Sequence, residues 1–400
     1  MKIKNTFAIK NINNKTFLIP FGQSVAAQQR ALELNSTGVF ICNALKNDLS
    51  DDELLSLIIN EYHPDNEDIK NIAADIRSFL QILKAYNTLE CNDDTFFIPT
   101  GIPFIQYMKI AGITIKLTAP KALIHPDFES FKIDEKDIDN NSASEVTCAD
   151  LCIDVTDCMS PIKPTGNILI RSEELMIIDS HSEYICIYLN CNRLKEWHLS
   201  KNLQNCKIFC SDVDFCARDE LFNAIRMIFL VKAQSKNLFA IHSSSLLYNN
   251  KAWLFSGHSG AGKSTHTSLW KQLFNTPLIN GDLNLIGIKD NKPTIYGIPW
   301  CGTSQIFDNK TYPLGGIIFL RKSDCDEIIE PENHKKILAI MSRLISPSWT
   351  IEMMEKNLAF SEQLFNLIFT ANLKCTKNTS AAITAKKSID SYLENNGDLS

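Results

Sequence analysis

The spacing of apolar and polar residues near the N-terminus predicts a small winged-helix-like module. Residues 6–9 and 16–19 read as the two strands of a hairpin, because the turn formers Asn13 and Asn14 separate them. Three helical patterns follow: residues 36–45, a segment that opens with a capping box from Ser50 to Glu53, and an amphipathic stripe at positions 69, 72, 73, 76, 79, 80 and 83. A hairpin followed by three helices is therefore expected over residues 1–92.

Farther along the chain, short apolar runs predict a layer of strands and then a mixed domain. Strand-like runs typical of an antiparallel layer lie at residues 113–117, 168–170, 175–178, 184–189 and 207–209, and the polar residues 134–145 indicate an exposed loop. Residues 221–231 predict a buried helix, 314–320 a buried strand and 334–398 mostly helix. The fold class expected is α+β, a winged-helix-like module followed by a mixed α/β domain.

One stretch nearly dictates its chemistry. The apolar run 252–255 leads into a loop that matches the pattern G-x-x-x-x-G-K-[ST], and a helical pattern follows at residues 266–274. In this pattern, glycines let backbone N–H groups face a polyphosphate, the lysine neutralises the β and γ charges, and the final hydroxyl can bind Mg²⁺. ATP with Mg²⁺ is the expected cofactor pair, and its candidate binding residues are Gly257, Ser259, Gly260, Ala261, Gly262, Lys263, Ser264 and Thr265.

Other candidates surround this loop in the sequence. Asp282 follows the short apolar run 277–280, where its carboxylate could hold Mg²⁺ together with Ser264 or accept a proton; alternatively, Asn-Gly-Asp is simply a turn. The strand predicted at 238–242 is expected to lead into the loop by way of Ser243, Ser244 and Ser245. Residues 296–302 form a loop rich in glycine and proline whose Trp300 suggests a wall of a substrate pocket.

Composition restricts which partners the protein is expected to bind and in which cellular compartment it is expected to lie. The chain has 400 residues and a formal net charge of −6, which argues against a general nucleic-acid binder. The N-terminus lacks the apolar core of a signal peptide and no uncharged apolar run is long enough for a bilayer, so no membrane partner and a cytoplasmic location are expected. Thirteen cysteines suggest reduced, mostly buried thiols. Two triplets with one spacing, 148/152/158 and 206/210/216, leave a metal site as the alternative.

The first 92 residues resemble the PqqD-type recognition element of peptide-modifying systems, on the order of hairpin, Leu34-Asn35-Ser36-Thr37-Gly38, capped helix and leucine-rich helix. The resemblance implies that this part binds the leader of a ribosomally made precursor peptide, which adds as a strand to the hairpin edge and packs against a helix. Acidic residues fill the middle of the module and would repel DNA; they are Asp48, Asp51, Asp52, Glu53, Asp65, Glu67 and Asp68. A purely structural cap remains the alternative.

Residues 104–398 resemble the HPr kinase-like branch of the phosphoenolpyruvate carboxykinase-type nucleotide fold. The resemblance is carried by His242-Ser243-Ser244, the stretch 254–267, Gly297-Ile298-Pro299-Trp300-Cys301-Gly302, and Asn309 with Pro313-Leu314. It implies transfer of phosphate from ATP to a serine-type hydroxyl, with Lys263 and the loop amides on the phosphates, and Ser264 and Asp282 on Mg²⁺. Asp282 is also implied as the base, and His242 either touches the transferring phosphate or is only hydrogen-bonded.

Two departures from that family fall on the chemistry. The family commonly has two adjacent acids where this chain has Gly281 and Asp282, and it often has a lysine where this chain has Thr303. The sequence therefore predicts an ATP-dependent peptide kinase, with Lys263, Asp282 and His242 as catalytic residues. A nucleotide-binding adaptor without catalysis and a kinase for a free small molecule such as an amino acid are the alternatives, and a homo-oligomer is left open.

Overall fold

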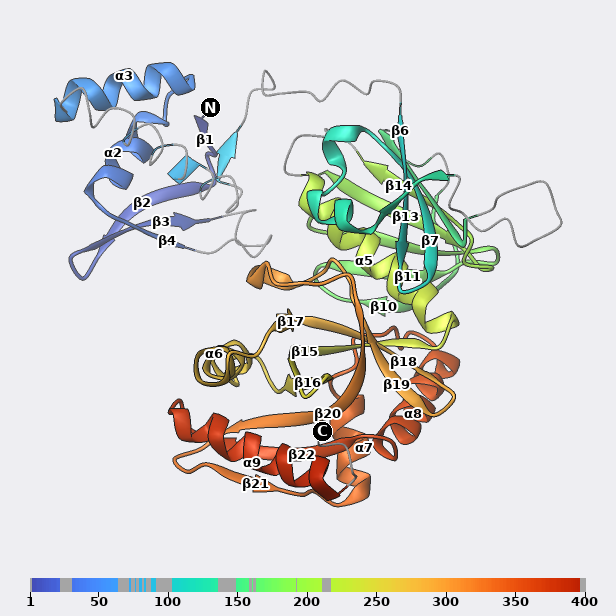
Figure 1. The fold of residues 1–400 in the computed structure, drawn as a ribbon. Coiled ribbons are helices and arrows are strands. Elements are labelled where there is room, and N and C mark those ends of the chain that lie inside the picture. The colour runs from blue at the N-terminus through green and yellow to red at the C-terminus, as the bar shows by residue number, and fades with distance from the viewer. Residues whose placement is uncertain are drawn as a thin grey trace. The chain divides into compact units, whose positions relative to one another are not determined.

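The computed structural model combines helices and strands in an α+β arrangement, as expected (Figure 1). It describes residues 2–21, 31–63, 72, 76, 79–80, 83, 88–90, 103–135, 149–157, 160, 163–191, 193–210 and 217–395. The chain divides into two compact units, Met1–Phe97 and Ile98–Ser400.

In the first unit the predicted hairpin is confirmed. Strands β2 (Phe7–Ile12) and β3 (Lys15–Pro20) pair in antiparallel fashion across Asn13 and Asn14, whose φ angles are 48° and 64°. Two central residues with positive φ give the turn whose twist matches that of the flanking strands. Among the described residues, β4 (Leu32–Leu34) adds to β3 as a third strand, and β1 (Lys2–Ile3) pairs with β5 (Leu89–Glu90).

The first two helices of this unit also form as predicted. In α2 (Ser36–Ala44) the Asn35 side chain accepts a hydrogen bond from the Gly38 amide at 2.7 Å, and α3 (Asp51–Tyr62) begins with the complete Ser50/Glu53 capping box. Each side chain satisfies a backbone N–H that the helix leaves unpaired. Of the third stripe, positions 72, 76, 79, 80 and 83 are helical, whereas 69 and 73 lie outside the described residues.

The second unit opens with a large sheet that is wider and less regular than the antiparallel layer expected. In the described part of the chain, its nine strands run in the order β10-β11-β12-β13-β14-β9-β7-β6-β8. Their bounds are β6 (Phe104–Ile110), β7 (Ile113–Ala119), β8 (Lys132–Ile133), β9 (Leu151–Asp157), β10 (Asn167–Arg171), β11 (Leu175–Asp179), β12 (Glu183–Tyr188), β13 (Leu194–Ser200) and β14 (Asn205–Cys210). The purely antiparallel prediction is wrong, because β9 lies parallel to both β7 and β14. The long connection from β7 to β9 permits this direction, since parallel neighbours need a long crossover.

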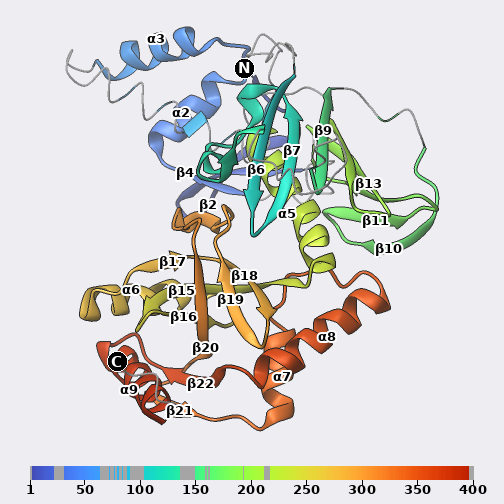
Figure 2. The ribbon, with the colours of Figure 1, turned by 45° about the vertical axis from the view of Figure 1, so that its right-hand side comes forward.

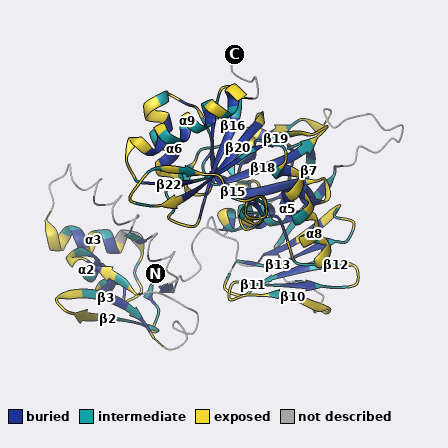
Figure 3. Cartoon of the chain, turned by 90° about the horizontal axis from the view of Figure 1, so that it is seen from below, coloured by how far each residue is buried: buried dark blue, intermediate teal, exposed yellow. Residues whose placement is uncertain are grey.

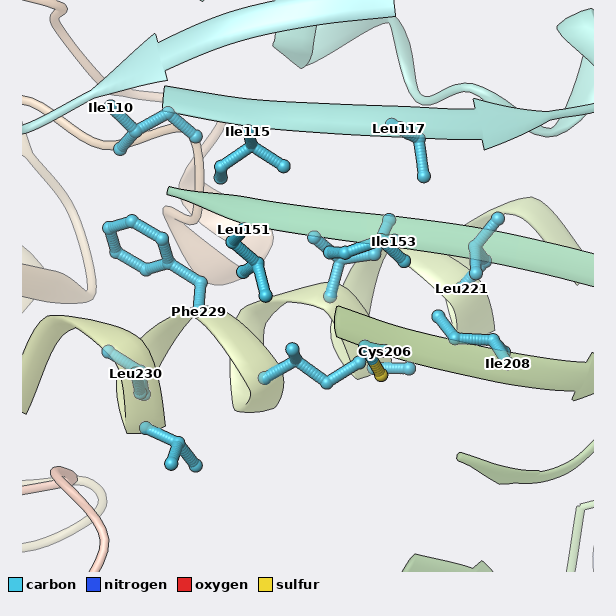
Figure 4. Packing of buried hydrophobic residues seen from close by; sticks show 14 of the residues in the cluster. Ile110, Ile115, Leu117, Leu151, Ile153, Cys206, Ile208, Leu221, Phe229 and Leu230 are labelled. Atoms are coloured by element: carbon cyan, nitrogen blue, oxygen red, sulfur yellow. The ribbon is translucent and has the colours of Figure 1, made fainter. Parts of the chain in front are cut away.

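The buried helix predicted at residues 221–231 is confirmed as the centre of α5 (Ala217–Ser235), which covers one face of this sheet. Figure 4 shows apolar side chains of β7, β9 and β14 in one buried cluster with Leu221, Phe229 and Leu230 of the helix. The same buried cluster continues into Leu283 and Trp300, which precede or flank the candidate site residues. The site therefore rests on a packed core that α5 shares with both sheets.

The second sheet carries the glycine loop. Among the described residues it has eight strands, and pairing of β16 with both β15 and β20 links its two sides. The strands are β15 (Leu238–Tyr248), β16 (Lys251–Ser256), β17 (Leu278–Asn280), β18 (Leu283–Lys289), β19 (Lys292–Tyr296), β20 (Thr311–Lys322), β21 (Glu327–Ile329) and β22 (Phe369–Cys375). These include the predicted strands at 238–242, 252–255 and 314–320. The strands are largely buried, whereas the helices around them carry exposed positions (Figure 3).

One prediction in this region is wrong. The serines at 243–245 do not form a connection to the glycine loop: they are buried inside β15, which continues to Tyr248 before a turn leads into β16. Their hydroxyls are satisfied internally, since Ser245 Oγ donates to Asn284 Oδ1 at 2.6 Å and Ser244 Oγ donates to the Gly281 carbonyl at 2.7 Å. The C-terminal segment is mostly helical, as predicted, with strand β22 in its midst, which pairs parallel to β20.

The remaining helices flank this second sheet. Helix α6 (Lys263–Phe274) packs against α9 (Thr379–Asn395), and α7 (Asn333–Met341) packs against α8 (Ile351–Phe365) (Figure 2). Short 3-10 turns occur at η1 (Lys121–Leu123), η2 (Pro126–Phe131) and η4 (Gly302–Ser304). No helix in the described ranges has both the length and the apolar character needed to cross a bilayer.

Candidate functional site

The glycine loop connects β16 to the first turn of α6. Gly260 and Gly262 have φ angles of 72° and 98°, a left-handed conformation that glycine adopts without strain. Gly257 lies tightly against its surroundings, since a Cβ there would be 2.8 Å from the Ala261 Cβ and 3.0 Å from the Leu320 carbonyl oxygen. The Ala261 amide donates to the His258 carbonyl at 3.0 Å and closes the turn. This loop leads into the N-terminus of α6, where unpaired N–H groups and the helix dipole favour an anion.

The remaining loop positions are accessible or half-buried as a phosphate-binding role requires. Ser259, Ser264 and Thr265 are exposed, and Lys263 is half-buried at the start of α6. Burial lowers the pKa of the Lys263 ammonium, and the positive charge of Arg343 acts in the same direction, whereas the Asp282 carboxylate raises it. Lys263 therefore lies within electrostatic range of both an acid and a second cation.

Asp282 and His242 are brought together by two adjacent strands. His242 in β15 is the register partner of Leu283 in β18, and the Ser243 amide donates to the Asp282 carbonyl at 2.9 Å. The two side chains meet directly, with His242 Nε2 and Asp282 Oδ1 3.1 Å apart. This hydrogen bond is the main cause that lowers the pKa of Asp282; the charges of His242, Lys263 and Arg226 add to it, and burial opposes it. The carboxylate is thus ionised at neutral pH.

The Asp282 carboxylate is not needed to form the Asn-Gly-Asp turn. Instead, Asn280 Oδ1 accepts from the Asp282 amide at 2.9 Å and from the Leu283 amide at 3.1 Å, which is an Asx-type turn. The Asn280 amide group also donates to the Trp300 carbonyl at 3.2 Å. The turn interpretation of this segment is therefore confirmed, and Asn280 makes the turn while the Asp282 side chain is directed to His242.

The position before Asp282 has no room for a second acid. A Cβ on Gly281 would lie 2.0 Å from Ser304 Oγ and 2.3 Å from Ser304 Cβ. Ser304 is itself fixed, since its hydroxyl donates to the Cys301 carbonyl at 2.6 Å and accepts from the Ile306 amide at 3.2 Å. Gly302, with a φ of 60°, is also close, and a Cβ there would be 2.9 Å from Asp282 Cγ. Ser304 thus fills the space that a side chain at position 281 would need.

Trp300 does not line a pocket as the sequence suggested. Its side chain is 1% exposed, and its indole Nε1 donates to the Phe222 carbonyl of α5 at 3.0 Å. The exposed residues of this loop are Gly302 and Thr303, and these are the ones that can face a ligand beside Asp282. The tryptophan instead anchors the loop to the core.

Two further residues join the site that the sequence analysis did not find. Arg343 follows α7, its guanidinium nitrogen lies 3.1 Å from both ring nitrogens of His258, and its carbonyl accepts from the His242 amide at 2.9 Å. Arg226 lies on α5 and is electrostatically coupled to Asp282. A charged residue inside the apolar run 221–231 was an available signal for Arg226, whereas Arg343 follows a helix with no pattern around it.

The comparisons with known proteins add no relative to this picture. No protein-family model matches the chain, and no curated protein matches it.

The donor set suits a nucleotide accompanied by Mg²⁺ better than a cage made only of side chains. Among the described residues, no group of three His, Cys, Asp or Glu side chains is arranged to hold a metal. Magnesium usually takes one or two protein oxygens together with phosphate oxygens, and the Ser264 hydroxyl and Asp282 carboxylate supply that number. Of the cysteine triplets, Cys206 and Cys210 are buried in β14 and Cys152 is half-buried in β9, while Cys148, Cys158 and Cys216 lie outside the described residues.

Proposed function

We propose that the chain is an ATP-dependent kinase of the HPr kinase-like type that phosphorylates a hydroxyl of a ribosomally made peptide. The observation that carries the proposal is the His242–Asp282 pair, whose side chains are 3.1 Å apart: His242 lies in β15, and Asp282 immediately precedes β18. Asp282 also interacts electrostatically with Lys263 at the end of the glycine loop. An ionised acid beside a cationic, glycine-lined anion site is what phosphoryl transfer requires. Lys263, Asp282 and His242 are the catalytic residues in this proposal.

The chemical step balances with the groups present. The acceptor oxygen forms a bond to the γ-phosphorus of ATP, the bond from that phosphorus to the bridging oxygen breaks, and ADP leaves with the electron pair. The proton of the acceptor hydroxyl passes to Asp282. A lowered pKa makes Asp282 a weak base, which suffices because the phosphoryl-transfer transition state is loose and positioning dominates.

The other residues of the loop position the nucleotide. The Lys263 ammonium binds the phosphates together with loop amides between Gly257 and Thr265 other than that of Ala261, which is paired with the His258 carbonyl. Ser264 and Asp282 would hold Mg²⁺, which supplies positive charge to the phosphate oxygens when bound. His242 donates to Asp282 and so fixes the direction in which the carboxylate can accept a proton.

The N-terminal unit supplies the peptide site in this proposal, in the manner of a PqqD-type recognition element. A groove of about 380 Å³ runs beside β2, with an apolar floor that includes Phe7 and Ile9. Three lysines, Lys4, Lys10 and Lys46, line the groove, and no acidic residue is among its lining residues. An extended segment can add to a sheet edge while its side chains enter such a groove, and the lysines favour an acidic segment.

A nucleotide-binding adaptor without catalysis is the second candidate, and one observation favours it. Ser304 occupies the place where the related kinases commonly have another acid, so a single carboxylate must serve both the metal and the proton. Binding would then persist without transfer. A test of turnover separates the two candidates.

The test incubates the intact chain with ATP, Mg²⁺ and the precursor peptide encoded beside it. We expect a peptide heavier by one phosphate group in the mass spectrum, with the label on a serine or threonine. Nucleotide binding without any mass gain would leave the adaptor and remove the kinase.

Lys263→Ala should abolish phosphate transfer and weaken ATP binding while peptide affinity stays unchanged, because the lysine belongs to the nucleotide site alone. Calorimetric titration with nucleotide and, separately, with peptide measures both. Lys271→Ala on the outer part of the same helix is the matched control, and it should leave both affinities intact. Equal loss of both affinities in a folded Lys263 variant would contradict the division of labour.

A further inference from the structure

We propose that Arg226 is the second phosphate-binding cation of the site and that its guanidinium binds the terminal phosphate of the nucleotide together with Lys263. The inference rests on the proposed function. It assigns a phosphate contact to a residue of helix α5, which precedes the glycine loop in the sequence and packs against the first sheet of the second unit.

The packing of α5 fixes which way this residue faces. Phe222 and Phe229, one turn before and one turn after Arg226, both contact Trp300, with ring centroids 5.8 Å and 5.0 Å apart. The Phe222 carbonyl also accepts the Trp300 indole N–H at 3.0 Å. Residues three and four apart share a helix face, so Arg226 lies on the face of α5 that meets the loop 299–302.

That loop leads directly to the catalytic carboxylate. Gly302 lies against Asp282, where a Cβ would be 2.9 Å from the Asp282 Cγ. Arg226 and Asp282 interact electrostatically. The positive charge of Arg226 lowers the pKa of Asp282, and the negative charge of Asp282 raises the pKa of Arg226, against the effect of burial, which lowers it. Arg226 is therefore held near the acid that faces the glycine loop.

The guanidinium is not hydrogen-bonded to another group in the described part of the chain. Among the residues that the structure describes, Arg226 has no hydrogen-bond or ion-pair partner, although it is half-buried. A charged group taken out of water without hydrogen bonds is costly, and a ligand that supplies acceptor oxygens would offset that cost. The planar, five-donor guanidinium fits a phosphate in bidentate fashion, better than an ammonium does.

This assignment also answers one departure from the related kinases. Thr303 stands where they often have a lysine and is exposed, so the loop itself brings no cation to the site. Arg226 supplies a positive charge from α5, the helix against which this loop packs through Trp300. The alternative is that Arg226 only neutralises Asp282, in which case it would not distinguish a triphosphate from a diphosphate.

The experiment uses that difference. Calorimetry on the intact chain, with Mg²⁺ present, compares a non-hydrolysable ATP analogue with ADP for the wild type, Arg226→Gln and Arg226→Lys. Loss of a charge-assisted contact should weaken binding of the triphosphate about 10- to 100-fold in Arg226→Gln, with ADP binding changed by less than about 2-fold. Arg226→Lys should show a smaller loss confined to the triphosphate. Arg171→Gln, a change at an exposed position of β10, is the control and should bind both nucleotides as the wild type does.

Each other outcome overturns a defined claim. Equal weakening of ATP analogue and ADP, or no weakening of either, overturns the assignment of Arg226. If Arg226→Gln does not fold, the same comparison on Arg226→Lys decides, and unchanged selectivity there also overturns it. A wild-type chain that binds neither nucleotide would instead overturn the proposed function itself.

Discussion

At the scale of single residues, Asp282 shows how one side chain is kept available for chemistry. Asn280 holds the turn, His242 orients the carboxylate, and Ser304 fills the space of a neighbouring acid. Because each of these three neighbours makes a different contact, its contribution can be tested by a substitution of its own.

The contact between Gly281 and Ser304 gives the first prediction. Gly281→Asp should destabilise the protein by roughly 1–3 kcal/mol, because its Cβ would lie 2.0 Å from Ser304 Oγ and the packed site cannot absorb it. The double variant Gly281→Asp with Ser304→Gly removes the clash and should recover much of that stability. Urea unfolding of the two variants and of Ser304→Gly alone measures the effect. A Gly281→Asp protein as stable as the wild type would contradict the steric role given to Ser304.

His266 provides a prediction about pH. This histidine is buried beside the glycine loop, its Nε2 accepts from Trp270 Nε1 at 3.1 Å, and burial lowers its pKa from 6.5 to about 4. The unfolded chain therefore binds more protons than the folded chain between pH 4 and 6.5. The free energy of unfolding should fall as pH drops through that window, by at most about 3 kcal/mol from this group.

The variant His266→Gln tests this origin, because an amide oxygen can still accept from Trp270 but does not titrate. Unfolding in urea at several pH values between 4 and 7 should show a shallower pH dependence for the variant than for the wild type. Parallel curves for the two proteins would place the pH dependence elsewhere.

At the scale of elements, the glycine loop depends on backbone conformation as much as on side chains. Gly262→Ala should cost about 1–2 kcal/mol, since its φ of 98° strains any residue with a Cβ. It should also weaken nucleotide binding, because relief of the strain turns the amides at the start of α6. Gly112→Ala is the matched control: its φ is 80°, and like Gly262 it has no heavy atom within 4 Å of the added Cβ. We expect similar losses of stability by urea unfolding, with nucleotide affinity lowered only in Gly262→Ala.

The elements that the sequence predicted are those fixed by local chemistry. Asn13 and Asn14 specify the hairpin turn, Ser50 and Glu53 the start of α3, and the glycines the loop before α6, all within a few residues. Strand β22 was missed because its polar sequence becomes a strand only by pairing with β20, more than forty residues earlier. Strand β13 was missed because Lys195 and Glu196 interrupt its apolar pattern.

The residues of the candidate site likewise divide into those that a local motif predicts and those that only the tertiary structure brings together. Lys263, Ser264 and Asp282 follow from short motifs, but the contact of His242 with Asp282 depends on the register of β15 against β18. Arg226 and Arg343 reach the site only through the packing of α5 and the segment after α7. Trp300 was misread because its burial against α5 involves residues far away in the sequence.

At the scale of the whole molecule, the two compact units give a test of the peptide's route. Deleting residues 1–97 should leave nucleotide binding by the second unit intact, while phosphorylation of a long precursor peptide collapses, because the tether that raises the local concentration of the acceptor is lost. Calorimetry with ATP and mass spectrometry of the peptide provide the two readings. Undiminished peptide phosphorylation would remove the recognition role of the first unit. Phosphorylation of a free amino acid by both the intact and the truncated chain would favour the small-molecule kinase.

The paired strands β15 and β18 have one more consequence. Because the acid and its histidine are set by a ladder of backbone hydrogen bonds, with the Ser243 amide on the Asp282 carbonyl at 2.9 Å, they need no rearrangement when a ligand arrives. In deuterium exchange, amides of these strands should be slow with or without nucleotide, and slowing on binding should be confined to residues 257–265. The arrangement of Asp282 and His242 would then be the same in the free and the bound protein. Only the amides of the glycine loop would change their exchange rate when a ligand binds.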